Sequence, residues 1–431
     1  MRSIRVVLDN FILSDFLKMR VHLRKLFSGL RLVLLMASLA LVWMLNSSWN
    51  WKTKMVTIMN LKNEFQLEGG YEYTIRPIAN VNYHQLWKKC HQTINKKSIY
   101  KPTTDIEEVI DALRHAKIIK ADIYSPSTAS AYKWMLTLEG GQKVLFKPAF
   151  TNKTVKESVK CVSGCEHPEY EVAGFALNRI LQLGNMPYAT GRHVSWDKEI
   201  TSVATEALRT SVTVQEGGDV CITWNCYLKH KSRYCFEKGV IRGAVIYWIS
   251  RGTVVQRVTR KGSFHHEFHF MGGFQEIFGP ILPGNRTFCD RVKTMQPYKT
   301  NWFSFGYLLD MAVIDFLMLN YDGGKHTYIV NRKERLYMDI MIDYGLSFCD
   351  REDPVLLAPI YQCCNIRQNL YKNLLKYSAN LTKVFDDATK DDPLYPLLLP
   401  RDITAMHQRL NTIIAIVQIC LKTYGETGVF V

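Results

Sequence analysis

Two aspartates, each directly after an apolar segment, have the residue type and spacing of a catalytic pair. Asp322 lies in Leu319–Gly324 (LNYDGG) after a long apolar run, and Asp343 lies in Met341–Gly345 (MIDYG). A β-hairpin between them would bring both carboxylates into one cleft. Phosphoryl transfer uses such a pair: one aspartate orients or deprotonates the acceptor hydroxyl, and the other holds a metal ion on the phosphates. Aspartate before glycine also favours plain turns, so the spacing alone leaves both interpretations open.

A lysine and two glutamates form a second group with the residue types of a nucleotide-phosphate site. Lys147 ends a strand-like run, and Glu166 and Glu171 follow it in the chain. A lysine on such a strand can reach the α- and β-phosphates and pair with a helix carboxylate. A lone strand lysine is otherwise an ordinary surface residue. The segment Ser125–Ser130 (SPSTAS) lacks the glycines of a kinase phosphate loop or a Walker motif, so it would use backbone amides and hydroxyls instead.

A histidine-rich segment, Phe264–Phe270 (FHHEFHF), also carries metal-binding residue types. Its spacing is not HExxH, and adjacent histidines on a strand point to opposite sides. We therefore favour a substrate-facing or surface loop over a metal site here.

The elements that must position these residues follow from hydrophobic periodicity. In the N-terminal half, alternating apolar residues predict an antiparallel meander whose last two strands are joined by the turn signal Glu139–Gly141. The predicted strands lie at 118–122, 134–138 and 144–147. A capping box predicts a helix over 104–116, and apolar spacing predicts another over 171–181.

After about residue 240 the pattern turns helical. The predicted elements are helices at 305–320 and 403–420 and, between them, a strand pair at 328–330 and 336–342. Together these elements predict an α+β, two-lobed fold, with a small β-rich N-terminal lobe (about 104–240) and a larger helical lobe (about 241–431).

Composition sets the class of partner that we expect. The chain has 431 residues, 47% of them apolar, which is enough for one large two-lobed domain. A formal charge of +16 fits either an ordinary solvated basic surface or attraction to polyanions such as sulfated glycans. The basic residues are scattered without a zinc-finger, RNP or homeodomain-like pattern, so we do not expect nucleic acid as a partner.

Residues 26–45 form an apolar run with one charge, Arg31, and a length that suits a bilayer core. Because basic residues precede the run, the positive-inside rule predicts a cytosolic tail (1–25), a transmembrane signal-anchor (26–45) and a lumenal remainder that begins with an irregular stem (46–103). A cleaved signal peptide is the alternative, but no small-x-small cleavage site follows the run. We therefore expect a single-pass type II membrane protein.

Cysteines and glycosylation sequons agree with a lumenal location. The 11 cysteines include no CxxC pair, which favours disulfides over a zinc ribbon, and their odd number leaves at least one thiol free or intermolecular. Sequons of the form N-x-[ST] occur at Asn46, Asn152, Asn285 and Asn380, and we expect glycosylation at Asn152, Asn285 and Asn380.

Longer segments resemble the secretory-pathway kinase family that includes the Golgi casein kinase and, within it, the glycosaminoglycan xylosylkinase branch. The matching segments are IIKAD (118–122), LEGGQKVLFKP (138–148), EVA through RIL (171–181), DFL with Asn320 and Asp322, and APIYQCCNIR (358–367). They extend over roughly residues 105–425, and EGGQKVLFKP and APIYQCC look closer to the xylosylkinase form.

The resemblance implies an atypical protein-kinase-like fold with ATP and Mn²⁺ or Mg²⁺ as cofactors. By this resemblance Lys147 would bind the ATP phosphates, and Glu166 and Asp343 would hold the metal ion, Asp343 also contacting the nucleotide. Glu171 would support the small-lobe helix. Asp322 would be the catalytic carboxylate.

The resemblance also implies nucleobase contacts, disulfides, a compartment and a substrate. The adenine would lie against the hinge residues Ile246, Tyr247, Trp248 and Ile249. The disulfide pairs would be Cys221–Cys235, Cys289–Cys363 and Cys364–Cys420. The catalytic domain would lie in the Golgi lumen behind a membrane anchor and would phosphorylate the 2-hydroxyl of xylose in the proteoglycan linkage region.

Two other functions stay open. The family's Arg-His-His after the catalytic aspartate is Gly323-Gly324-Lys325 here, its ATP-contacting glutamate falls near Thr327, and a family glutamine aligns with Ala131. These differences fit a pseudokinase that acts as a lumenal binding or allosteric subunit. A kinase for serine residues of secreted proteins is the second alternative.

Overall fold

The computed structural model describes most of the chain after residue 80. The described residues are 81–94, 98–100, 106–124, 132–149, 166–226, 230–250, 253–257, 305–320, 326–331, 333, 336–348 and 354–431. All of them lie in one compact unit, Tyr73–Val431. The predicted transmembrane segment 26–45 lies outside the described residues. Among the helices that are described, none is long and apolar enough to cross a membrane.

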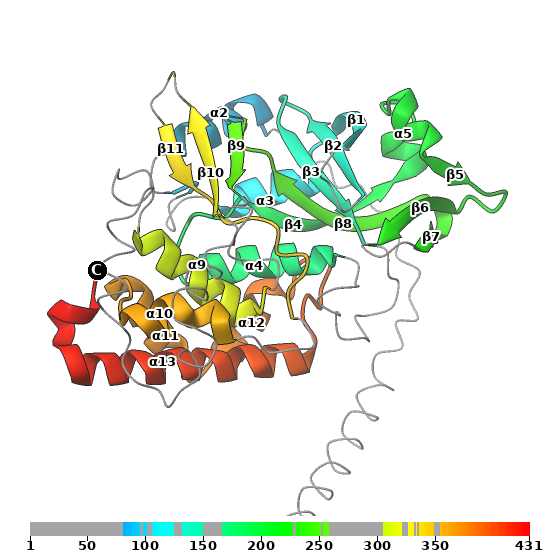
Figure 1. Cartoon of the computed structure of the whole chain (residues 1–431). Helices are drawn as coiled ribbons and strands as arrows, with labels where there is room; N and C mark the ends of the chain where they lie inside the picture. Colours follow the sequence, from blue (N-terminus) through cyan, green and yellow to red (C-terminus); the bar gives the residue numbers. More distant parts are fainter. Residues whose placement is uncertain are drawn as a thin grey trace, which may run out of the picture. The chain divides into compact units, whose positions relative to one another are not determined.

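A five-stranded antiparallel sheet forms the N-terminal part of this unit (Figure 1), with the strand order β1-β2-β3-β8-β4. The strands are β1 (Ile118–Tyr124), β2 (Lys133–Leu138), β3 (Lys143–Pro148), β4 (Ala189–Ser195) and β8 (Val240–Tyr247). Trp134 on β2 pairs with Phe146 on β3, and both are buried because alternate residues of each strand face the core. The predicted meander is confirmed. The sheet continues through β8, past the predicted lobe boundary near residue 240.

Helix α2 (Tyr83–Thr93) packs against the hairpin between β2 and β3. Trp87 is buried, and its Nε1 donates to the carbonyl oxygen of Glu139 at 2.8 Å. Gly140 has a φ of 82°, and a Cβ there would lie 2.8 Å from the Trp87 ring. The prediction of an irregular stem over 46–103 was therefore wrong for this helix, whose polar sequence (YHQLWKKCHQT) hides a narrow apolar face.

Helix α4 (Pro168–Ile180) lies between the sheet and the C-terminal helices (Figure 1). It contacts β4 and β8 on one side and α9 and α12 on the other, so every residue from Pro168 to Asn178 is buried. Proline in the first turn suits a helix start, because its missing N–H would have no partner there. The predicted helix over 171–181 is confirmed, and it starts three residues earlier than expected.

Helices form the C-terminal part, and the predicted helices at 305–320 and 403–420 are confirmed. They are α9 (Phe305–Met318), α10 (Ala358–Cys363), α11 (Gln368–Tyr377), α12 (Leu381–Thr389) and α13 (Pro400–Val429), with a 3-10 turn at Pro354–Leu357. Every residue of α9 from Tyr307 to Met318 is buried. On α13, Arg409 donates from Nε and Nη2 to the carbonyl oxygen of Leu317 at 3.0 and 2.8 Å, which satisfies a carbonyl at the end of α9.

Two three-stranded sheets complete the described strands. One has the order β11-β10-β9 and the other β5-β6-β7. The strands are β5 (Val212–Val214), β6 (Val220–Cys226), β7 (His230–Phe236), β9 (Thr253–Arg257), β10 (His326–Asn331) and β11 (Leu336–Asp339). The β10–β11 hairpin confirms the predicted strand pair. The expectation of a helical pattern after residue 240 was wrong for β8 and β9, because β9 pairs with β10, which comes much later in the chain.

Two of the three implied disulfides are confirmed. The bonds are Cys221–Cys235, between directly opposite positions of β6 and β7, and Cys364–Cys420, between the end of α10 and α13. Cys363 is disulfide-bonded as well. Its implied partner, Cys289, lies outside the described residues. Cys90 on α2 is a free, buried thiol.

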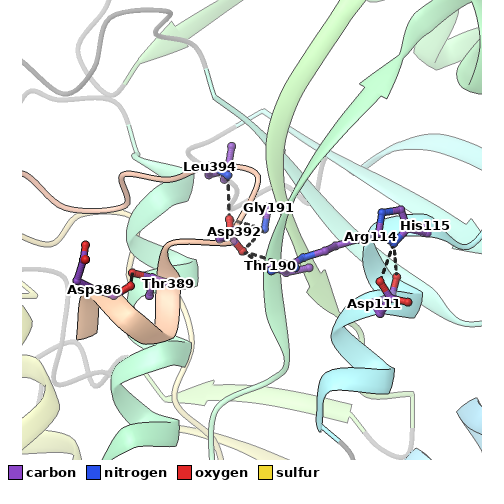
Figure 2. A network of polar contacts seen from close by, with 9 residues as sticks. All are labelled: Asp111, Arg114, His115, Thr190, Gly191, Asp386, Thr389, Asp392 and Leu394. Carbon is purple, nitrogen blue, oxygen red and sulfur yellow. Dashed lines mark hydrogen bonds and ion pairs between the residues drawn. The ribbon is translucent and has the colours of Figure 1, made fainter. Parts of the chain in front are cut away.

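A buried aspartate ties β4 to helix α3 (Ile106–His115) and to the segment after α12 (Figure 2). Asp392 accepts hydrogen bonds from Thr190 Oγ1 at 2.8 Å, from the Gly191 amide at 3.0 Å and from the Leu394 amide at 2.9 Å. Arg114 of α3 forms an ion pair with it at 3.2 Å. A Cβ on Gly191 would lie 2.5 Å from Asp392 Oδ1, so this approach requires glycine.

Candidate phosphate and metal site

Lys147 is the centre of a buried cluster of charged groups. Its Nζ lies 2.9 Å from Glu166 Oε2 and 2.8 Å from Asp343 Oδ1, and it also contacts Glu171 Oε1. Only 5% of the Lys147 side chain is exposed. The structure therefore brings together four residues that the sequence singled out from three distant segments.

The sheet and helix α4 position two of these four residues. Lys147 lies near the end of β3 and pairs with Ala244 of β8 in the middle of the sheet. Glu171 lies in the first turn of α4, where the helix dipole favours a negative charge. Its Oε2 accepts a hydrogen bond from the Tyr344 amide at 3.1 Å, and its Oε1 accepts one from the Gly345 amide at 3.2 Å. Glu171 thus joins the lysine to the segment that carries Asp343.

The segment after β11 presents Asp343 to the lysine. Asp343 has a φ of 73°, a left-handed conformation that aspartate tolerates better than most residues other than glycine. Glu166 lies against the same segment, because the His167 amide donates to the carbonyl oxygen of Gly345 at 2.8 Å. A Cβ on Gly345 would lie 2.9 Å from Glu166 Cβ, so glycine permits this approach. Glu166 and Asp343 are therefore fixed side by side.

The charges of the cluster keep Lys147 protonated. Burial disfavours its ammonium form, but Asp343, Glu166 and Glu171 outweigh burial and raise the pKa of Lys147 well above its ordinary value. The lysine is thus a permanent positive charge in this site.

A second lysine, Lys133, belongs to the same cluster and was missed from the sequence. Its Nζ forms ion pairs with Glu166 at 3.8 Å and with Asp343 at 3.9 Å. The register that pairs Trp134 with Phe146 brings Lys133 alongside Lys147 on the neighbouring strand. The pairing register of β2 and β3 could have pointed to Lys133, because two lysines at opposite positions need a carboxylate nearby.

The carboxylates of the cluster form a donor set that suits a hard divalent cation. One oxygen each of Glu166, Glu171 and Asp343 lies within 4.8 Å of the others. Carboxylate oxygens are the ligands that Mg²⁺ and Mn²⁺ prefer. Glu171 already accepts two backbone hydrogen bonds, whereas 35% of the Asp343 side chain is exposed. Glu166 and Asp343, the two predicted metal ligands, are therefore the residues best placed to hold the ion.

The four predicted adenine contacts lie at the end of β8 and just after it, and they divide into two pairs. The side chains of Tyr247 and Ile249 are buried, and the Tyr247 ring packs against Trp87 of α2. Those of Ile246 and Trp248 are half-buried. The Trp248 ring lies 5.6 Å from the ring of Tyr124 on β1, an aromatic residue that no sequence motif indicated. Ile246 and Trp248 are thus the better candidates for side-chain contacts with a nucleobase.

Several predicted positions lie outside the described residues. They are the proposed catalytic Asp322, Gly323 and Gly324, together with Ala131 and the histidine-rich segment 264–270. The elements that flank Asp322 are described: α9 ends before it and β10 begins after it. The Ile340 amide donates to the carbonyl oxygen of Thr327 at 3.0 Å. The first residues of β10 therefore lie beside the residue that follows β11. Thr327 itself is buried.

Curated relatives match most of the chain. A human glycosaminoglycan xylosylkinase is 30% identical over 370 residues, covering 84% of this chain and 87% of the relative. A Danio rerio glycosaminoglycan xylosylkinase is 28% identical and covers 80% of this chain and 82% of its own length. A mouse protein named Pseudokinase FAM20A is 26% identical and covers 80% of this chain and 67% of its own length.

Solved structures share the fold. A hydra Fam20 structure with sugar has a TM-score of 0.66 and 24% identity, covering 82% of this chain and 99% of its own. A Golgi casein kinase structure with Mn/ADP bound has a TM-score of 0.65 and 18% identity, covering 88% of this chain and 92% of its own. The family described as Golgi casein kinase, C-terminal, Fam20 matches residues 85–429. This match takes in nearly all of the described residues. The chain therefore belongs to the Golgi casein kinase (Fam20) family.

Proposed function

We propose that this protein is a kinase that transfers the γ-phosphate of ATP to a hydroxyl group of a glycan. The observation that carries the proposal is the buried cluster in which Lys147 meets Glu166, Glu171 and Asp343. A lysine on the third strand, a carboxylate on the following helix and a metal-binding aspartate after a hairpin are the parts that phosphoryl transfer requires.

Some residues of the cluster supply charge to the nucleotide, and others position the charged residues. Lys147 supplies a fixed positive charge to the ATP phosphates, and Glu171 holds both the lysine and the segment that carries Asp343. Glu166 and Asp343 would hold a divalent ion, which would supply positive charge against the phosphates. Asp322 orients or accepts the proton of the acceptor hydroxyl. Most of the rate acceleration then comes from positioning and electrostatics.

The acceptor that we favour is the 2-hydroxyl of xylose in the proteoglycan linkage region. The names of the two xylosylkinase relatives support a glycan acceptor. The formal charge of +16 is of the sign that attracts an acidic glycan.

The proposed location is the Golgi lumen, with a type II membrane anchor at residues 26–45. Disulfides such as Cys364–Cys420 persist in an oxidising compartment, and the sequon at Asn380 is exposed in front of α12. A C-terminal tag should be protected from protease in sealed microsomes. Digestion of that tag without detergent would exclude this topology.

A pseudokinase is the second candidate function. The replacement of Arg-His-His by Gly323-Gly324-Lys325 and the similarity to a protein named a pseudokinase favour it. In that case the cluster around Lys147 would serve nucleotide or metal binding without transfer.

Acceptor chemistry separates the alternatives. Purified protein with Mn²⁺ and ATP is given a xylose-containing linkage glycan, the same glycan carrying 2-O-methyl xylose, or casein. Phosphate on the first glycan alone is the expected result. Phosphate on both glycans would reject the 2-hydroxyl, and phosphate on casein alone would indicate a protein kinase. Nucleotide binding without any transfer would indicate the pseudokinase.

A further inference from the structure

Within the part of the chain that the structure describes, the Lys133 ammonium has two counter-charges but no hydrogen-bond acceptor. Only 10% of its side chain is exposed. Its ion pairs with Glu166 and Asp343, at 3.8 and 3.9 Å, are longer than any hydrogen bond. Elsewhere in the described chain its Nζ has no hydrogen-bond partner either, although an ammonium carries three donors. The ammonium of Lys133 therefore has donors that can serve a further anion beside the two carboxylates.

The carboxylates near Lys133 are committed to its neighbour. Glu166 and Asp343 hydrogen-bond to Lys147 at 2.9 and 2.8 Å, and each is about 1 Å closer to that lysine than to Lys133. When the same two carboxylates hold a divalent cation, their charge is shared with the cation. Lys133 then has less counter-charge beside it than it has without the cation. An additional anion beside it would restore the balance.

We propose that Lys133 is a second phosphate-binding lysine, which donates hydrogen bonds to phosphate oxygens of the nucleotide. This inference rests on the proposed nucleotide site and adds to it a residue that the sequence pattern does not indicate. Lys133 and Lys147 lie side by side on β2 and β3 and approach the same two carboxylates. Two adjacent ammonium groups suit a polyphosphate, whose negative charges are likewise adjacent.

The first test measures nucleotide affinity by calorimetry in the presence of Mn²⁺. Lys133→Met keeps an unbranched side chain that is one atom shorter and removes its charge, and it should weaken ATP binding about 10- to 100-fold, the range for a charge-assisted hydrogen bond. Adenosine, which has no phosphate, should bind as it does to the wild type. Lys133→Arg should recover most of the ATP affinity. Lys143→Met, an exposed lysine on the same sheet, is the matched control and should leave ATP binding unchanged.

A second test uses the wild-type protein and does not depend on the folding of a variant. ATP with Mn²⁺ should protect Lys133 from an amine-reactive label, read by mass spectrometry, whereas adenosine with Mn²⁺ should not. Lys143 should be labelled equally in both conditions.

The outcomes distinguish this inference from the proposed function. If the wild type binds ATP but Lys133→Met binds it as tightly as Lys143→Met, or if ATP leaves Lys133 labelling unchanged, Lys133 is not a phosphate ligand and the proposed kinase function stands. If the wild type binds no nucleotide at all, both are wrong.

Discussion

At the scale of single residues, the proposed metal site depends on the carboxylate of Asp343. Because aspartate and asparagine both tolerate the left-handed φ of this position, Asp343→Asn removes the charge without forcing the backbone to move. We expect the variant to lose Mn²⁺-dependent ATP binding and still to fold, because Glu166 and Glu171 remain as counter-charges of Lys147. Titration of ATP with and without Mn²⁺ measures the effect. The exposed Asp391→Asn is the control, and equal Mn²⁺ dependence in both variants would argue against Asp343 as a metal ligand.

The charge balance around Lys147 leads to a prediction about stability. Lys147→Met leaves Glu166, Glu171 and Asp343 close together without their central counter-charge. The expected loss in free energy of unfolding is about 3–5 kcal/mol, the range for removing one partner of a buried ion pair. Mn²⁺ should stabilise this variant more than it stabilises the wild type, since the ion supplies the missing positive charge. Urea unfolding with and without Mn²⁺ measures both effects, and an equal Mn²⁺ effect in the two proteins would contradict the prediction.

At the scale of elements, Asp392 is the main polar connection between β4 and the segment after α12 (Figure 2). Asp392→Ala leaves the Gly191 amide without its acceptor and removes the ion-pair partner of Arg114. A loss of about 2–4 kcal/mol in free energy of unfolding follows from stranding buried donors. Asp391→Ala changes the exposed neighbouring residue and should cost little. Chemical denaturation compares the two, and similar stabilities would mean that Asp392 does not hold these elements together.

Asp310 on α9 makes stability depend on pH. Burial raises its pKa to about 7 from an ordinary 3.8, against the opposing effect of Arg367 at 3.3 Å. Between these two pKa values the folded state binds a proton that the unfolded chain has lost. The contribution of Asp310 is therefore fully present below about pH 4 and is lost as pH rises toward 7, on the order of 4 kcal/mol at most.

The variant Asp310→Asn removes this titration. The unfolding free energy of the wild type, minus that of the variant, should fall as pH rises from about 4 to about 7, as measured by urea denaturation at several pH values. A constant or rising difference over this range would show that Asp310 is ionised in the folded protein.

At the scale of the whole molecule, local patterns predicted local elements. The alternation in β2 and β3 and the apolar run of α9 were visible because each depends on residues close in sequence. Strands β4, β6 and β8 were not predicted, since polar or glycine-containing stretches such as ATGRHVS become strands only through partners far along the chain. Helix α2 was hidden for a related reason: its few apolar residues matter only against the β2–β3 hairpin.

The residues of the candidate site also divide into those that local sequence indicated and those that depend on distant strand pairing. Lys147, Glu166, Glu171 and Asp343 were named from residue type and from resemblance, and the structure brings them together. Lys133 was missed because its place beside Lys147 is decided by strand register, and Tyr124 because its contact with Trp248 crosses from β1 to the end of β8. Periodicity predicts which face of a strand is buried, but it does not predict which residue of another strand lies beside it.

The central claim is that the whole molecule transfers phosphate, and its most direct test follows the γ-phosphate itself. Wild-type protein, Asp322→Asn and Asp391→Asn are incubated with Mn²⁺, γ-labelled ATP and a xylose-containing linkage glycan, and ATP affinity is measured for each. The wild type and Asp391→Asn should label the glycan equally. Asp322→Asn should bind ATP normally but transfer on the order of 10²-fold less, the usual loss for a missing general base. Normal ATP binding by the wild type with no label on any hydroxyl acceptor would contradict the account.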